Sequence, residues 1–229
     1  MISTREHLKN CLKSDIGRFE DKPNLMAWIR RNDDWYLWNI IRTLRYAEYY
    51  VNKEKNGGFI YKLLKRYYSW RLRKIDLKHQ MYISPNTIDE GFRIYHLGRI
   101  MIAPKAKIGK NFTIRPNCVV GYLAGNNEKA PIIGDDVEFS VGSSVFGGIK
   151  IGRGARLGPY SVAYHNIPPY AIAIGNPAKI VGFRYEPQQI VDLEITMYEP
   201  DERIPLKILE RNYDKYYLSR KDEIANYLK

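Results

Sequence analysis

Apolar residues recur at every sixth position through the middle of the chain. One unbroken run consists of Ile133, Phe139, Val145, Ile151, Leu157 and Ala163, and a second consists of Ile102, Ile108, Ile114 and Val120. Upstream, Ile88, Ile94 and Ile100 keep the spacing, with a slip of two residues before Ile102. A period of six fits neither the 3.6-residue repeat of a helix nor the alternation of a simple strand. It does fit a short strand followed by a tight turn, with the apolar side chain pointing inward.

Glycine supports this strand-and-turn unit. It follows the apolar residue directly in several repeats, as at Gly109, Gly134 and Gly152, where a turn needs backbone freedom. Three units make a triangular coil of about 18 residues, and stacked coils form a parallel β-solenoid with an aliphatic interior. We therefore expect a mainly β chain with a β-helix over residues 79–184, interrupted once by a loop at residues 121–131 that leaves the solenoid surface.

The two flanks have a different pattern. Helical spacing relates Leu37, Ile40, Ile41, Leu44 and Ala47, and less regularly Ile60, Leu63, Leu64, Tyr67 and Leu72. Residues 1–78 therefore predict a helical N-terminal cap. After residue 184 the repeat stops and Pro187 can open a helix, so residues 185–229 predict a helical C-terminal extension. Both exposed edges of the solenoid would thus be covered.

Composition narrows the class of protein. No run approaches the roughly 18 consecutive apolar residues of a membrane span, and the first ten residues are too polar for a secretory signal. The two cysteines, Cys11 and Cys118, exclude a disulfide scaffold and a four-cysteine zinc site, so we expect a cytoplasmic protein. The net charge of +12, from 37 Lys and Arg against 25 Asp and Glu, predicts an anionic partner.

Specific motifs resemble a known family. The period, the Ile-Gly pairs and residues 174–179 (IGNPAK) resemble the left-handed β-helix, or hexapeptide-repeat, acyltransferases. Residues 91–100 (GFRIYHLGRI) and 103–109 (APKAKIG) resemble the serine acetyltransferase-like branch, many of whose members modify sugars of surface polysaccharides. The resemblance implies left-handed coiling, acetyl-CoA as donor, no metal, and a homotrimer with active sites in grooves between neighbouring solenoids.

Acetyl transfer to a hydroxyl needs a base to take its proton and donors to stabilise the oxyanion. Histidine suits the first role near neutral pH, and the chain has His7, His79, His96 and His165. The branch motif implies that His96 is the general base, whereas a histidine with a purely structural role at a solenoid corner is the alternative. Asp89, Glu90 or a backbone carbonyl could orient its ring.

The family's remaining site positions can be carried over. The resemblance assigns Ser143, Pro159, Tyr164, His165, Lys179 and Arg184 to CoA binding, with Lys179 toward a phosphate. Ser143 also occupies the small-residue position of the repeat, so it could be structural. Tyr95 and, in the interrupting loop, Tyr122, Asn126, Asn127 and Glu128 offer hydrogen bonds to an acceptor, although an ordinary exposed loop would have the same composition.

Departures from the branch pattern bear on the acceptor. Tyr95 stands where serine acetyltransferases have Asp before the catalytic histidine, and their second histidine is replaced near Ala130. We therefore expect O-acetylation of a sugar hydroxyl in a surface polysaccharide or its precursor. The alternatives are a serine or other small-molecule acetyltransferase, N-acetylation of an amino sugar, and a catalytically idle binding solenoid.

The basic segment at residues 61–78 is a separate feature. It holds seven Lys and Arg against Asp76, with Tyr67, Tyr68 and Trp70 interleaved. Such a helix can contact an anionic membrane, here the inner face of the cell membrane. The alternative, which we favour, is a cap helix that packs its aromatic residues on the solenoid. We expect no nucleic-acid partner.

Overall fold

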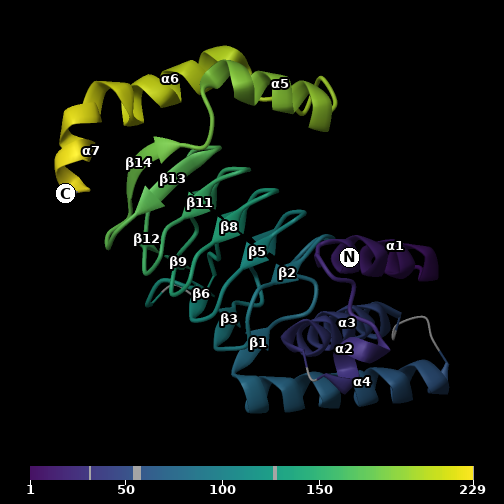
Figure 1. Ribbon diagram of the computed structural model, residues 1–229. Helices are drawn as coiled ribbons and strands as arrows, with labels where there is room; N and C mark the ends of the chain where they lie inside the picture. Colours follow the sequence, from purple (N-terminus) through teal and green to yellow (C-terminus); the bar gives the residue numbers. More distant parts are fainter. Residues whose placement is uncertain (31, 54–57, 126–127, 229) are drawn as a thin grey trace.

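The computed structural model describes residues 1–30, 32–53, 58–125 and 128–228. A column of short strands runs through its centre, with one group of helices at each end (Figure 1). The strands form three sheets, here named sheets A, B and C. Sheet A contains β1 (Met81–Ile83), β3 (Ile100–Ile102), β6 (Cys118–Gly121), β9 (Ser144–Phe146) and β12 (Val162–Ala163). Sheet B contains β4 (Lys107–Ile108), β7 (Ile132–Ile133) and β10 (Lys150–Ile151). Sheet C contains β2 (Arg93–Ile94), β5 (Thr113–Ile114), β8 (Glu138–Phe139), β11 (Arg156–Leu157), β13 (Ala171–Ile174) and β14 (Lys179–Phe183).

The register confirms the parallel solenoid that the six-residue period predicts. Ile100 pairs with Cys118 and Phe139 with Leu157, both in parallel, so each strand pairs with the strand one coil further along the chain. The ladder that faces the interior of sheet C is completely buried: Ile94, Ile114, Phe139, Leu157 and Ala173. At the last coil β14 turns back and pairs antiparallel with β13, which ends the stack.

The N-terminal helices are α1 (Arg5–Gly17), α2 (Leu25–Ile29), α3 (Asp33–Lys53) and α4 (Phe59–His79). α3 buries the predicted helical face, including Leu37, Ile41 and Leu44, in the same core as the first coils of the solenoid. The expectation of a mainly β chain underestimates the share of residues in helices. α3 and α4 contain 21 residues each, whereas each strand contains between two and five. The reason is that turns occupy most of each repeat.

The packing expected for α4 is partly wrong. Leu72 is buried, and Tyr68 stacks on Tyr46 and Tyr50 of α3 with ring centroids 5.1 and 5.3 Å apart. Tyr67 and Trp70, however, are 46% and 54% exposed. The aromatic residues of this helix are therefore divided between two faces, and one of them lies open to solvent.

A buried ion cluster joins the N-terminal helices to the first coil. Arg45 of α3 bonds Asp15 of α1 at 2.7 Å and Glu48 at 3.0 Å, and it donates to the carbonyl oxygens of Ile88 and Asp89. The Asp15 carboxylate also accepts from the backbone N–H groups of Gly91 and Phe92 at 2.8 and 2.9 Å. The cluster thus holds the segment that leads directly into β2.

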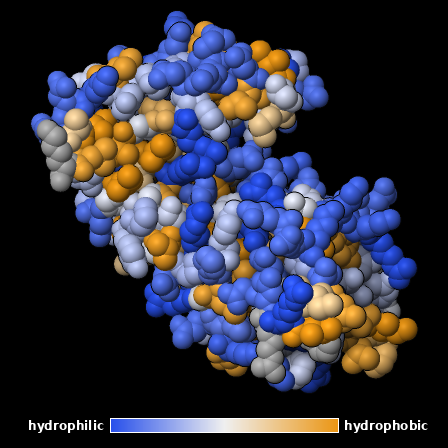
Figure 2. Space-filling model, in the orientation of Figure 1, coloured by the Kyte–Doolittle hydropathy of each residue, from blue (hydrophilic) through white to orange (hydrophobic). Residues whose placement is uncertain are grey.

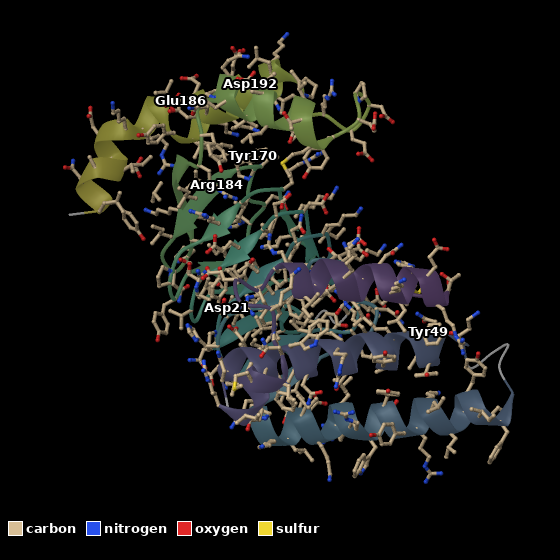
Figure 3. The ribbon with its side chains drawn as sticks, turned by 45° about the vertical axis from the view of Figure 1, so that its right-hand side comes forward. Asp21, Tyr49, Tyr170, Arg184, Glu186 and Asp192 are labelled. Carbon is tan, nitrogen blue, oxygen red and sulfur yellow. The ribbon has the colours of Figure 1, made fainter. Side chains whose placement is uncertain are left out.

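At the other end the chain forms α5 (Pro187–Met197), α6 (Leu206–Tyr216), the short 3₁₀ helix η2 (Leu218–Arg220) and α7 (Lys221–Tyr227). Buried Glu194 of α5 accepts from the Tyr170 hydroxyl and from the backbone N–H of Ile204, and Arg153 lies 3.6 Å from it. Figure 3 shows Tyr170 at the end of the solenoid beneath α5. This carboxylate fastens the C-terminal helices to the last coil.

Asp76 of α4 gives a prediction on stability. One of its carboxylate oxygens is buried without a hydrogen-bond partner, and burial raises the pKa of the group to about 6. Because the folded pKa exceeds the unfolded one, the stability linked to the protonated form is lost as pH rises through about 6. We expect Asp76→Asn to stabilise the protein by about 1–2 kcal/mol at pH 8 and by less at pH 5. Thermal melts at both values measure this, and an unchanged or lower Tm at pH 8 would contradict it.

Candidate active site

His96 lies at the corner where the chain leaves sheet C for sheet A. β2 ends at inward-facing Ile94, and residues 95–99 turn toward β3. The turn is held close to the next coil, because a Cβ added at Gly98 would stand 2.8 Å from Pro116 Cβ. Tyr95 and His96 are exposed, with ring centroids 6.5 Å apart. The imidazole is therefore carried on a rigid corner and can reach a ligand.

This corner borders a cavity of about 260 Å³ between the solenoid and the N-terminal helices. Its lining consists of Arg93, Tyr95 and His96 from the first coil, Glu20, Asp21 and Asn32 from the chain between α1 and α3, and Asp33 and Asp34 from the first turn of α3. Figure 3 shows Asp21 where these helices meet the solenoid. Arg93 bonds Asp34 at 2.8 Å and lies 3.7 Å from the centre of the Phe19 ring. The ion pair therefore fixes the start of α3 beside His96.

The cavity is lined mainly by negative charges, whereas the whole chain has a net charge of +12. Among the described residues that line it, four carry carboxylates and one carries a guanidinium that is already paired with Asp34. Such a site favours a cation over a neutral or anionic ligand. In the described part of the chain, no group of three or more His, Cys, Asp or Glu is arranged to hold a metal ion.

Neither of the two carboxylates that we considered as partners for His96 lines its cavity. Glu90 pairs with Lys110 at 3.1 Å, and Asp89 and Glu90 line a different cavity, beside Arg45. The carboxylates that do share the cavity with His96 were not predicted from the sequence. Two acidic pairs, at residues 20–21 and 33–34, stand out in a basic chain, but no local pattern relates them to a residue more than 60 positions away.

The residues expected to bind CoA lie along both edges of sheet A. Pro159 and Lys179 are exposed at the edge shared with sheet C, the edge that also carries His96. Tyr164 and His165 are exposed at the opposite edge, toward sheet B, where the Tyr164 ring stacks on Phe146 with centroids 6.0 Å apart. One copy of the chain therefore does not bring the predicted set together.

Two members of that set have other roles. Ser143 is fully buried, its hydroxyl oxygen lies 3.5 Å from the Cys118 sulfur, and both its backbone groups bond within the solenoid. The buried side chain fits the structural alternative, and a CoA contact through the backbone of this residue stays a prediction. Arg184 follows β14 at the end opposite Lys179 and donates to the carbonyl oxygen of Gly154 at 3.2 Å. It lies on the sheet C side, away from the edge that carries Lys179.

The interrupting loop leaves sheet A at the edge opposite His96, between β6 and β7. Tyr122 accepts a hydrogen bond from the backbone N–H of Lys105 at 3.2 Å, so its hydroxyl braces the loop. Glu128 is exposed. Asn126 and Asn127 lie outside the described residues.

The outer side of sheet A is apolar. Tyr82 and Met101 are 37% and 40% exposed on adjacent strands, and the row continues through half-buried Val119, buried Ser144 and half-buried Val162, so four of its five members are apolar. The outer side of sheet C carries charges instead, where Glu138 bonds both Arg115 and Arg156. An exposed apolar sheet face flanked by polar edges is typical of an interface between subunits.

Known proteins with similar sequences and structures identify the fold. No family model matches the chain. It is 34% identical over 95 residues to a serine acetyltransferase of Bacillus licheniformis, covering 41% of this chain and 44% of that protein. It is 30% identical over 111 residues to the serine acetyltransferase of Escherichia coli, covering 48% and 41%. The chain thus spans less than half the length of these curated relatives.

Solved structures resemble it over a larger part. Serine acetyltransferase from Brucella abortus superposes with a TM-score of 0.62 at 20% identity, covering 78% of this chain and 70% of the other. The soybean apoenzyme gives 0.60 at 22% identity, covering 77% and 69%. The chain therefore has the fold of the solved serine acetyltransferases, the left-handed parallel β-helix that the resemblance implies.

Proposed function

We propose that the protein is an acetyl-CoA-dependent acetyltransferase whose acceptor is a small molecule with a hydroxyl and a positively charged amine, of which serine is the model. The observation that carries the proposal is the acidic cavity beside His96. The curated relatives are serine acetyltransferases, and one solved neighbour is a serine acetyltransferase in complex with CoA.

His96 acts as the general base in this proposal. Its neutral imidazole takes the proton from the acceptor hydroxyl as that oxygen attacks the thioester carbonyl. The new C–O bond forms and the C–S bond breaks, and the imidazolium returns the proton to the departing thiolate. The reaction yields an acetyl ester and CoA, and the base is regenerated.

The carboxylates of the cavity bind the acceptor's ammonium group. Charge-assisted hydrogen bonds of this kind are stronger than neutral ones. Asp34 is held in place by Arg93, whereas Asp21 and Asp33 are exposed and face the cavity without that pair. Because nearby carboxylates keep an amine protonated, and an ammonium is no nucleophile, the hydroxyl is the acceptor atom. The same argument disfavours N-acetylation of an amino sugar.

A homotrimer completes the site. Packing sheet A against neighbouring copies would cover Tyr82 and Met101. It would also bring opposite edges of sheet A from two copies together. One copy would contribute the edge with Tyr164 and His165, and the next copy the edge with His96, Pro159 and Lys179. A CoA molecule could then contact both edges, which one chain keeps apart.

The polysaccharide acceptor expected from the sequence is not supported. The relatives and solved neighbours are serine acetyltransferases. A neutral sugar hydroxyl also offers no cation to the four carboxylates. We expected a polysaccharide acceptor because position 95 lacks the Asp of the branch pattern. In the structure, the carboxylates of this cavity come instead from the N-terminal helical region, at residues 20–34.

The test is CoA release from acetyl-CoA with three acceptors: L-serine, 3-hydroxypropanoate, which lacks the amine, and glucose. We expect turnover with L-serine and a kcat/KM at least about tenfold lower with 3-hydroxypropanoate, as for the loss of one charge-assisted contact. Equal rates with and without the amine, or turnover with glucose alone, would contradict the proposed acceptor.

The carboxylates themselves give a second prediction. We expect Asp21→Asn combined with Asp33→Asn to raise the KM for L-serine about tenfold or more, with a smaller change in kcat, because the contacts bind the ammonium in ground and transition state alike. Glu6→Gln, which removes a single exposed carboxylate on α1 away from the cavity, serves as control. An unchanged KM in the double variant would remove these two residues from the site.

A further inference from the structure

One face of α4 exposes a continuous row of large apolar side chains. Its members are 46% to 80% exposed: Phe59, Ile60, Leu63, Tyr67, Trp70 and Leu77. Figure 2 shows hydrophobic atoms gathered at the lower right, over the end of α4 that begins at Phe59. Isolated exposed apolar residues are ordinary, but a contiguous row marks a surface that binds something.

This row has a regular geometry. From Ile60 to Leu77 its members are three or four residues apart, with Lys74 filling the remaining position, so they form one stripe along the helix. The opposite side of α4 is already used, because Tyr68 stacks on α3 and Leu72 is buried. The stripe is therefore a second apolar face, which the described residues of the chain leave open.

The charges beside the stripe indicate what covers it. Seven Lys and Arg lie between residues 61 and 78, and the sole acidic residue there, Asp76, is half-buried. Arg66, Arg71, Arg73 and Lys78 directly flank the stripe in sequence. A second copy of α4 would bring like charges together, which is unfavourable. An anionic occupant complements them.

The aromatic residues favour a lipid surface. Lys74 Nζ lies 4.1 Å from the centre of the Trp70 ring, and the Arg71 guanidinium lies 5.8 Å from that of Tyr67. Tryptophan and tyrosine beside basic side chains are typical of helices that lie in a membrane interface. Within the described chain, no helix is both long and apolar enough to cross a bilayer.

We propose that α4 docks the protein on an anionic bilayer surface, with Phe59, Leu63 and Trp70 entering the headgroup region and the flanking Lys and Arg contacting acidic lipid headgroups. This surface lies on the side of α4 that faces away from α3. The inference does not depend on the proposed acetyltransferase activity.

Flotation of the full chain with vesicles tests the proposal. One set contains phosphatidylcholine alone and the other about one third phosphatidylglycerol. We expect binding to the acidic vesicles at low salt and at least about tenfold weaker partitioning to neutral ones, since each basic residue near the surface contributes to the attraction. Raising the salt should also release the protein from acidic vesicles, because it screens these charges.

Variants identify the surface. Arg66→Glu with Lys74→Glu should lower partitioning about tenfold or more, and Leu63→Gln with Trp70→Gln should also lower it. Lys207→Glu with Lys221→Glu, the same charge change at exposed positions on α6 and α7, is the matched control. Circular dichroism checks that each variant is folded.

Three outcomes of the flotation experiments would overturn the proposal. These are no binding of the folded wild type to acidic vesicles, equal loss in the control variant, or equal binding to neutral vesicles. The main rival is self-association, in which a second copy of the chain covers the stripe. Light scattering in the absence of lipid tests for it. If the Leu63 and Trp70 variants lower the molecular mass of the particle, a second copy covers the stripe and the lipid proposal fails.

Discussion

Replacing His96 by alanine is expected to lower kcat at least about 100-fold while CoA still binds. The reason is that His96 lies on a solenoid corner, exposed and beside the acidic cavity, where it would take the proton of the acceptor hydroxyl. Removing a general base leaves donor binding intact but removes that proton transfer from the transition state. Steady-state CoA release gives kcat, and calorimetry gives the Kd for CoA.

His7→Ala is the matched control, because His7 is exposed on α1 at a distant cavity. We expect its kcat to stay near that of the wild type. A His96→Ala enzyme with nearly normal turnover would remove His96 from catalysis and leave it as a corner residue. A variant that no longer binds CoA would instead point to a structural or donor-binding role.

Replacing Arg45 by methionine is expected to destabilise the protein by about 3–5 kcal/mol. The guanidinium is 1% exposed and bonds Asp15, Glu48 and two backbone carbonyls. Without it two carboxylates remain buried with no opposite charge, and breaking one side of a buried pair is costly. Urea unfolding measures the loss of free energy.

Arg42→Ala controls for the loss of an arginine from the same helix, because Arg42 is exposed and bonds the Asn39 side chain. Its effect should stay within about 0.5 kcal/mol. A change below about 1 kcal/mol in the Arg45 variant would show that the cluster does not hold the helices to the first coil. Activity of the folded Arg45 variant should also fall, since the cluster secures the segment before β2.

The solenoid could be predicted because each coil repeats the same local requirement. Ile94, Ile114 and Leu157 are inward-facing residues of short strands, and each is buried. The period is a property of the sequence alone, and neighbouring coils supply most of the contacts. His96 itself was singled out by the resemblance of residues 91–100 to a family motif and not by the period, and the structure places it at the corner between β2 and β3.

The acidic cavity could not be predicted in this way. Asp21 and Asp33 line the same cavity as His96 because α1 and α3 pack on the first coil, and this packing depends on long-range contacts such as Arg45 with Asp15. A periodic pattern carries no information about such contacts. For a related reason we favoured packing of the α4 aromatic residues on the solenoid over membrane contact, since helical spacing shows an apolar face but not whether a partner within the chain covers it.

A competition assay is the most direct measurement of the proposed chemistry. Acetyl-CoA with an isotopically labelled acetyl group is offered to an equal mixture of L-serine, glucosamine and glucose, and mass spectrometry with fragmentation locates the label. The proposed function predicts label on the serine hydroxyl in the wild type and its near-complete loss in His96→Ala. Label found on a sugar instead of serine, or acetyl transfer that does not require His96, would contradict it.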